Sequence, residues 1–127
     1  MRFEDEIDFR ALNHWLARCR PMPTRCKALP YQHAFTGTHV GALQRGMIPR
    51  DMDDKWFGVL REGAPDFCRS WTGFHFYRLY LRGEGRGLVV HKLIVNRGRS
   101  QYANTDDGHD REMVGFLIER MLGGQTG

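Results

Sequence analysis

Residues 54–97 contain a run of closely spaced strand-like segments, which limits the possible folds more than any other part of the sequence. Four segments rich in aromatic and β-branched residues follow one another, at 55–61, 67–71, 74–82 and 88–95. Their connections, including a turn-forming stretch at 62–66, are short and contain Gly, Pro or Asp. Parallel neighbours would need crossover segments of a dozen residues or more, so this run predicts an antiparallel meander.

Two helices are expected on either side of this meander. In residues 1–20 apolar side chains recur with helical spacing, Asp5 and Asp8 supply acidic residues for the first turn, and Pro21 ends the pattern. A second helix is predicted over 105–122, with Thr105 as its N-cap. Its apolar stripe comprises Met113, Val114, Phe116, Leu117, Ile118, Met121 and Leu122. The predicted fold is therefore α+β, with both helices covering one face of a four-stranded antiparallel sheet.

Residues 21–53 have no clear period. They contain four of the five prolines and predict irregular chain, with one short helix near 39–45. A connection of this length is unusual inside a compact domain, and one hypothesis makes 33–54 the active-site loop of an enzyme. We expect residues 1–127 to form one α+β domain.

The first residues, the lack of a long apolar run and the cysteine spacing predict a cytoplasmic protein without a cofactor. Residues 1–6 are acidic where a signal peptide would be basic and then apolar, and no apolar run is long enough for a membrane span. Cys19, Cys26 and Cys68 are odd in number and have no C-x-x-C spacing, so we expect reduced thiols and neither a disulfide nor a metal site. No catalytic residue is predicted.

Charge leaves the choice of partner open. The net charge is +4, and the basic residues are sixteen Arg and only three Lys. Arginine has a planar five-donor group that matches carboxylates and phosphates and stacks on aromatic rings. Nucleic acid is not expected as a partner, because the aromatic and basic residues do not match the RNA-recognition-motif signature.

Arginine and aromatic residues are interleaved in the second and third predicted strands. Side-chain alternation places Phe67, Arg69 and Trp71 on one face, and it groups Phe76, Arg78 and Tyr80 in the same way on the next strand. The predicted binding residues are Arg69, Trp71 and Arg78, with Trp56 and Tyr80 as stacking walls. The alternative is that both arginines simply stack on aromatic rings at a solvent-facing surface.

The turn between these strands decides what the two arginines face. A turn at Gly73 and Phe74 places Arg69 opposite Arg78, whereas a turn at Thr72 and Gly73 places Arg69 opposite Phe76. The first register is favoured, because Thr is poorly suited to a positive φ. Facing guanidinium groups repel unless something negative lies between them, so this register predicts either a bound anion or a buried acidic partner.

Two motifs in this region suggest a family. Asp54-Lys55-Trp56-Phe57, then Phe67-Cys68-Arg69-Ser70-Trp71-Thr72-Gly73 with Tyr77 on the next strand, resemble a group of small uncharacterised bacterial proteins with a DKWF…RSWTG pattern. The resemblance covers roughly residues 47–122. This group is loosely associated with ADP-ribosylglycohydrolase-like proteins, which implies a nucleotide or ADP-ribose-like ligand.

Two functions follow as hypotheses. The first is a small binding domain whose arginine and aromatic face takes an anionic small molecule. The second is a protein–protein interaction module that docks an acidic partner on the same face, since Trp, Tyr and Arg dominate such contacts.

Overall fold

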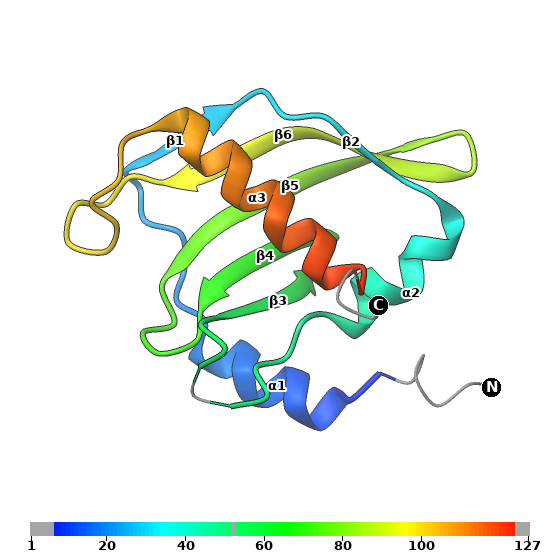
Figure 1. The fold of residues 1–127 in the computed structure, drawn as a ribbon, viewed down its shortest axis with the longest axis horizontal. Helices are drawn as coiled ribbons and strands as arrows, with labels where there is room; N and C mark the ends of the chain where they lie inside the picture. The colour runs from blue at the N-terminus through cyan, green and yellow to red at the C-terminus, as the bar shows by residue number, and fades with distance from the viewer. Residues whose placement is uncertain (1–6, 52, 124–127) are drawn as a thin grey trace.

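A computed structural model of the chain describes residues 7–51 and 53–123 and shows an α+β fold with an antiparallel sheet (Figure 1). The strand order is β1-β6-β5-β4-β3, and β2 also pairs with β6. The strands are β1 (Cys26–Leu29), β2 (His33–Phe35), β3 (Trp56–Arg61), β4 (Ala64–Arg69), β5 (His75–Glu84) and β6 (Gly87–Asn96). The predicted meander is confirmed as β3 to β6.

The sheet has six strands, and the prediction of four was wrong. The two additional strands, β1 and β2, lie in the region expected to be irregular and pair with β6. They have four and three residues, and each buries only its last residue, Leu29 or Phe35. Segments this short show no alternation that sequence analysis could detect. A 3₁₀ turn, η2 (Gly37–His39), and the short helix α2 (Val40–Arg45) complete this region.

Both long helices begin at aspartate caps. Helix α1 (Phe9–Arg18) begins after Asp8, whose side chain accepts a hydrogen bond from the Ala11 N–H at 3.0 Å; Asp5 lies outside the described residues. Helix α3 (Asp107–Met121) is capped by Asp106 and not by Thr105, because the Asp106 carboxylate accepts from two N–H groups of the first turn. In the described part of the chain, no helix has the length and apolar character needed to cross a bilayer.

The two helices pack on opposite faces of the sheet, so the expectation that both cover one face was wrong. Helix α3 crosses one face (Figure 1) and buries Val114, Leu117, Ile118 and Met121 in a cluster that includes Trp56 and Phe67. Helix α1 packs with Phe57, Val59 and Cys68 in a second cluster. Neighbouring residues of a strand point to opposite faces. Trp56 and Phe67 therefore lie in the cluster under α3, and Phe57 and Cys68 lie in the cluster under α1. Phe116, expected in the apolar stripe, is 53% exposed.

The strand register separates Arg69 from Arg78. Asp66 lies opposite Arg78 and Phe67 opposite Tyr77, and a bulge then shifts the pairing so that Cys68 lies opposite His75. Arg78 therefore shares a face with Asp66, and Arg69 shares the other face with Phe67. Neither predicted register is correct. The reason is the bulge, which leaves Phe76 as an extra residue and turns both Phe76 and Tyr77 toward α3.

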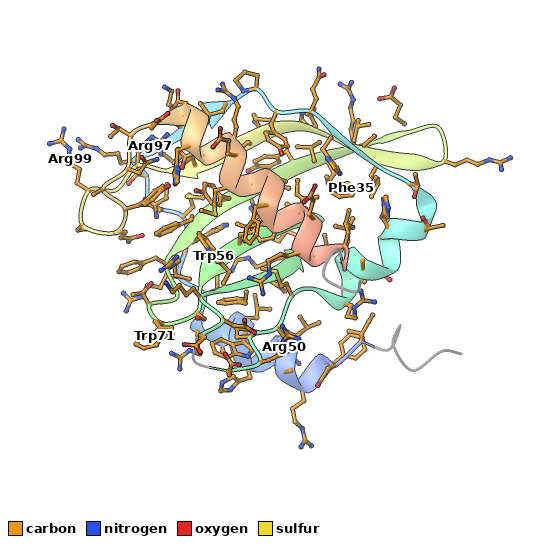
Figure 2. All side chains as sticks on the ribbon, in the orientation of Figure 1. Phe35, Arg50, Trp56, Trp71, Arg97 and Arg99 are labelled. Atoms are coloured by element: carbon orange, nitrogen blue, oxygen red, sulfur yellow. A yellow bond between two sulfur atoms is a disulfide. The ribbon has the colours of Figure 1, made fainter. Side chains whose placement is uncertain are left out.

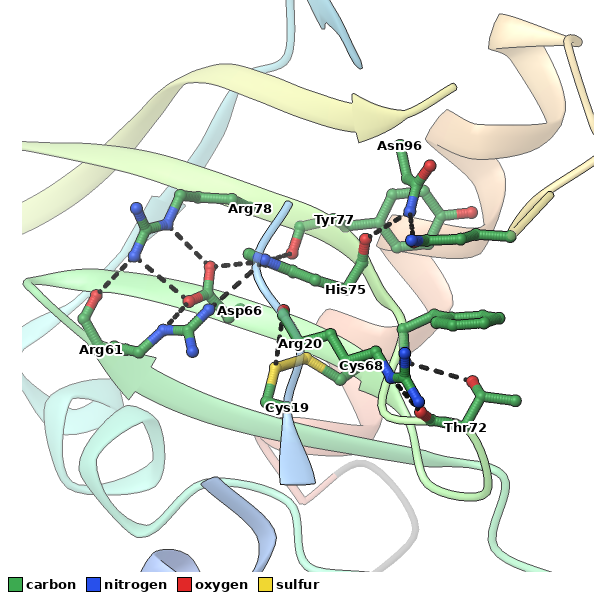
Figure 3. Close-up of a disulfide and its surroundings, with 12 residues drawn as sticks. Cys19, Arg20, Arg61, Asp66, Cys68, Thr72, His75, Tyr77, Arg78 and Asn96 are labelled. Atoms are coloured by element: carbon green, nitrogen blue, oxygen red, sulfur yellow. Dashed lines mark hydrogen bonds and ion pairs between the residues drawn. A yellow bond between two sulfur atoms is a disulfide. The ribbon is translucent and has the colours of Figure 1, made fainter. Parts of the chain in front are cut away.

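A disulfide joins Cys19 to Cys68, which corrects the expectation of three reduced thiols (Figure 3). Cys19 directly follows α1, and Cys68 lies on the face of β4 that α1 covers, with a Cα–Cα distance of 6.3 Å. Helix packing brings the two together across 49 residues of sequence, which spacing rules could not reveal. Only Cys26 is a free thiol among the described residues, and it is exposed.

Candidate functional site

The structure does not bring the five predicted binding residues into one site. Trp56 is buried and stacks on Tyr77 at 5.8 Å, and the Arg69 guanidinium lies 4.9 Å from the Trp56 ring centre. Arg78 lies on the opposite face of the sheet. The Lys92 ammonium lies 4.6 Å from the Tyr80 ring centre, and the Arg78 guanidinium lies 5.9 Å from it. Trp71 is outside the strands, in the β4–β5 turn, with 65% of its surface exposed.

Arg78 belongs to an internal ion cluster centred on a fully buried carboxylate, Asp66 (Figure 3). Arg78 donates from Nε to one Asp66 oxygen at 2.8 Å and from a terminal nitrogen to the other at 3.2 Å. Arg61 donates from Nε to Asp66 at 2.8 Å, and His75 places Nε2 2.9 Å from the same carboxylate. We call these four residues the carboxylate cluster.

The carboxylate cluster leaves little for a ligand to bind. A cavity of about 520 Å³ adjoins it, lined by Cys19, Pro21, Met22, Arg61, Glu62, His75 and Arg78. Arg78 also donates to Glu62 at 3.0 Å and to the Arg61 carbonyl at 3.2 Å. Burial alone would lower the pKa of Arg78, but its hydrogen bonds to Asp66 and Glu62 raise that pKa above the ordinary value. An acidic partner was predicted to lie between Arg69 and Arg78, whereas Asp66 pairs with Arg78 and Arg69 lies on the other face of the sheet.

The best candidate site is a second cavity, of about 420 Å³, beside the end of α1. It is lined by Trp15, Arg18, Pro49, Arg50, Asp51, Ser70 and Trp71, and we call it the tryptophan pocket. Figure 2 labels Trp71 and Arg50 in this lower part of the molecule. Its size falls within the roughly 300–1,000 Å³ typical of small-molecule pockets. Of the predicted binding residues, only Trp71 lines it.

The β4–β5 turn holds Trp71 at the rim of this pocket. Within the turn, the Arg69 N–H donates to the Phe74 carbonyl at 2.9 Å and the Gly73 N–H donates to the Arg69 carbonyl at 2.8 Å. Gly73 has a φ of +75°, and a Cβ there would overlap the Arg18 carbonyl, so no other residue fits. The Arg20 N–H donates to the Gly73 carbonyl at 2.7 Å, which ties the chain after α1 to this turn.

Other contacts fix the remaining walls. Trp15 packs on Phe57 with ring centres 5.6 Å apart, and the Arg18 guanidinium lies 5.4 Å from the Trp15 ring centre. Ser70 is buried, and its hydroxyl donates to the Asp54 carbonyl at 2.7 Å. The disulfide joins residues next to Arg18 and to the turn, so it fastens both sides of the pocket together.

Arg50 lines the tryptophan pocket and lies beside Asp54. The Arg50 N–H donates to the Asp54 carboxylate at 2.8 Å, and the Arg50 Nε lies 3.5 Å from it. That backbone hydrogen bond is the main cause that holds the pKa of Asp54 below its ordinary value of 3.8. The side chain of Arg50 is 75% exposed, so this ion pair leaves most of the guanidinium accessible.

The tryptophan pocket combines three chemistries. The indole rings offer flat apolar surfaces, Arg18 and Arg50 offer charged donors, and Asp51 offers an acceptor whose oxygen already receives the Asp53 N–H at 2.9 Å. Sequence analysis missed Trp15, Arg18 and Arg50 as site residues. Trp15 fitted the apolar stripe of a helix, and nothing in the local sequence marks either arginine as a neighbour of Trp71.

The described residues contain no group of three or more His, Cys, Asp or Glu side chains placed to hold a metal ion. At the start of the short helix near 39–45, the Thr36 N–H donates to His39 Nδ1 at 3.1 Å, so the chain caps this turn itself. Comparison with family models, curated proteins and solved structures finds no match for this chain.

Proposed function

We propose that the chain is a small binding domain whose tryptophan pocket takes an anionic ligand with a flat ring, of the nucleotide class. The observation that carries the proposal is the joint lining of one cavity by Trp15 and Trp71 with Arg18 and Arg50. An aromatic ring is worth about 1–3 kcal/mol per stacked base, and arginine matches phosphate oxygens with two parallel hydrogen bonds.

The acidic residue of the pocket narrows the ligand class. A simple inorganic anion would be repelled by the Asp51 carboxylate, which lines the same cavity as the arginines. A nucleotide carries hydroxyl or amino groups that can donate to a carboxylate, as well as phosphate oxygens that arginine can bind. The three chemistries of the pocket therefore fit a nucleotide better than they fit phosphate alone.

Calorimetric titration with AMP and ADP tests the proposal. We expect binding to the native protein, at least about tenfold weaker binding after Trp71→Ala because a stacking surface is lost, and a similar loss after Arg50→Ala. Phe116→Ala is the matched control, because Phe116 is also exposed but lies on α3. Equal affinities in Trp71→Ala and Phe116→Ala would contradict the proposal.

The alternative is an acidic protein partner that docks over Trp71. In that case an acidic peptide would bind in a Trp71-dependent way, and nucleotides would neither bind nor compete with it. The calorimetric titration therefore includes a glutamate-rich peptide, and that outcome would replace the nucleotide hypothesis.

A further inference from the structure

A second cationic cavity lies at the far end of β6, away from the tryptophan pocket. It has a volume of about 380 Å³ and is lined by Arg25, Arg97, Arg99, Tyr102, Ala103 and Thr105. Figure 2 labels Arg97 and Arg99 at this corner of the molecule. We call it the arginine pocket.

The three arginines of this pocket are not equivalent. Arg97 donates to Asp107 at 2.8 Å and to the buried Asp110 at 2.6 Å, so its charge is neutralised from within. Arg25 and Arg99 are exposed, and within residues 7–51 and 53–123 their side chains have no hydrogen-bond or ion-pair partner. The pocket therefore presents two uncompensated guanidinium groups beside a fixed one.

One short segment, residues 18–25, connects the two pockets. Arg18 lines the tryptophan pocket, and Arg25 lines the arginine pocket. At one end the Arg20 N–H bonds to the β4–β5 turn, and at the other the Arg97 N–H donates to the Arg25 carbonyl at 2.9 Å. Seven residue steps span at most about 25 Å of extended chain, which limits the separation of the two ends.

An exposed aromatic ring lies at one end of this path of positive charge. Trp71 has 65% of its surface exposed, whereas the Phe74 ring is covered by the Arg20 guanidinium at 5.2 Å and the Tyr102 ring stacks on Phe76 at 4.2 Å. Positively charged side chains together with an exposed aromatic ring are what proteins use to bind single-stranded nucleic acid without strong sequence preference. Base-paired nucleic acid would keep its bases stacked internally and would offer no ring to the tryptophan pocket.

We infer that the natural ligand is a short stretch of single-stranded nucleic acid, with one base in the tryptophan pocket and a later phosphate in the arginine pocket. The inference rests on the proposed function and names the substrate class of the same site. This inference departs from the sequence-based expectation of no nucleic-acid partner. That expectation rested on the absence of the RNA-recognition-motif signature. The sequence does not show that Arg25 and Arg99 converge on one pocket.

Binding of labelled oligodeoxythymidylates of increasing length tests the inference. Affinity should rise with length until both pockets are occupied, and a duplex of the same length should bind more weakly. The double variant Arg25→Ala/Arg99→Ala should lower oligonucleotide affinity about tenfold and reduce the slope of log affinity against log salt by about 0.7, because about 0.7 is lost for the one phosphate contact in this pocket. Its affinity for AMP should be unchanged.

The matched control is Arg82→Ala/Arg86→Ala, which removes the same charge from the exposed β5–β6 hairpin. Equal oligonucleotide binding by the two double variants, or no rise of affinity with length, would overturn the inference while leaving AMP binding at the tryptophan pocket intact. A glutamate peptide that binds as tightly as an oligonucleotide of equal charge would also overturn it. Loss of the proposed function itself would appear separately, as AMP binding that does not depend on Trp71.

Discussion

The carboxylate cluster and the tryptophan pocket each contain two arginines, but the arginines have opposite roles. In the cluster, Arg61 and Arg78 converge on Asp66, whose side chain is completely buried. In the pocket, the Arg50 Nε lies 3.5 Å from the partly exposed Asp54, and Arg18 lies against an indole ring. Arg61 and Arg78 are thus held by a buried counter-charge, whereas the side chain of Arg50 is 75% exposed.

The largest effect is expected at the centre of the cluster. Asp66→Ala should lower the free energy of unfolding by about 3–5 kcal/mol, because it leaves Arg61 and Arg78 without their buried counter-charge. Denaturant unfolding measures this change. The matched control is Asp51→Ala in the tryptophan pocket, which should change stability by no more than about 0.5 kcal/mol. Similar losses in the two variants would remove the distinction between the regions.

Removal of the disulfide should disturb the tryptophan pocket without changing any residue of the carboxylate cluster. Cys19→Ser/Cys68→Ser should cost about 2–4 kcal/mol by freeing a long loop in the unfolded chain. It should also weaken AMP binding, because the link between the end of α1 and the β4–β5 turn is lost. Cys26→Ser is the control, since Cys26 is exposed and unpaired.

The same disulfide bears on the expected location of the protein. Disulfides persist mainly in oxidising compartments and are rare in the cytosol. Thiol titration in denaturant should find one reactive thiol per chain without reductant and three after reduction. Three reactive thiols in protein purified without reductant would contradict the Cys19–Cys68 pairing and restore the sequence-based expectation.

Two arginine substitutions should have opposite effects on stability and on ligand binding. Arg78→Ala should lower the free energy of unfolding by about 1–3 kcal/mol, because a buried acceptor loses a charged donor, and should leave AMP affinity unchanged. Arg50→Ala should do the reverse, with a stability change of no more than about 0.5 kcal/mol and weaker AMP binding. Denaturant unfolding and calorimetric titration with AMP should be measured for both variants. AMP binding that is weakened by Arg78→Ala would contradict these roles.

The smallest effect concerns acid pH. The pKa of Asp54 lies below its ordinary value of 3.8, mainly because of the Arg50 N–H. A lowered folded-state pKa means that this contribution to stability is present above the ordinary value and is lost as the pH falls through the lower folded value. Asp54→Asn should therefore show a slightly shallower loss of stability below about pH 4. Identical acid unfolding curves would show that the contact contributes nothing.

The meander and the last helix could be predicted from sequence because both depend on local patterns. Short connections allow only antiparallel neighbours, and the spacing of Val114, Leu117, Ile118 and Met121 is read within a single helix. The short helix near 39–45 was also found, as α2. These features do not depend on which distant segment packs against them.

The candidate site could not be predicted, because distant contacts create it. Asp66 was assigned to a turn at 62–66, yet β4 begins at Ala64 and places that carboxylate opposite Arg78. No residue type marks Phe76 as the extra residue of a bulge, so alternation placed Phe76 on the face of Arg78, whereas the bulge turns it toward α3 together with Tyr77. Trp71 was predicted to bind ligand and lines the tryptophan pocket, but its neighbours there, Arg18 and Arg50, lie on other segments.

The proposed function places the ligand at the tryptophan pocket and not at the arginine and aromatic face of the sheet. The chain has three tryptophans, and each indole N–H gives its own NMR signal. Trp15 and Trp71 line the pocket, whereas Trp56 is buried beneath Arg69. Titration with AMP should shift the signals of Trp15 and Trp71 and leave that of Trp56 in place. A shift of the Trp56 signal without those of Trp15 and Trp71 would contradict the account.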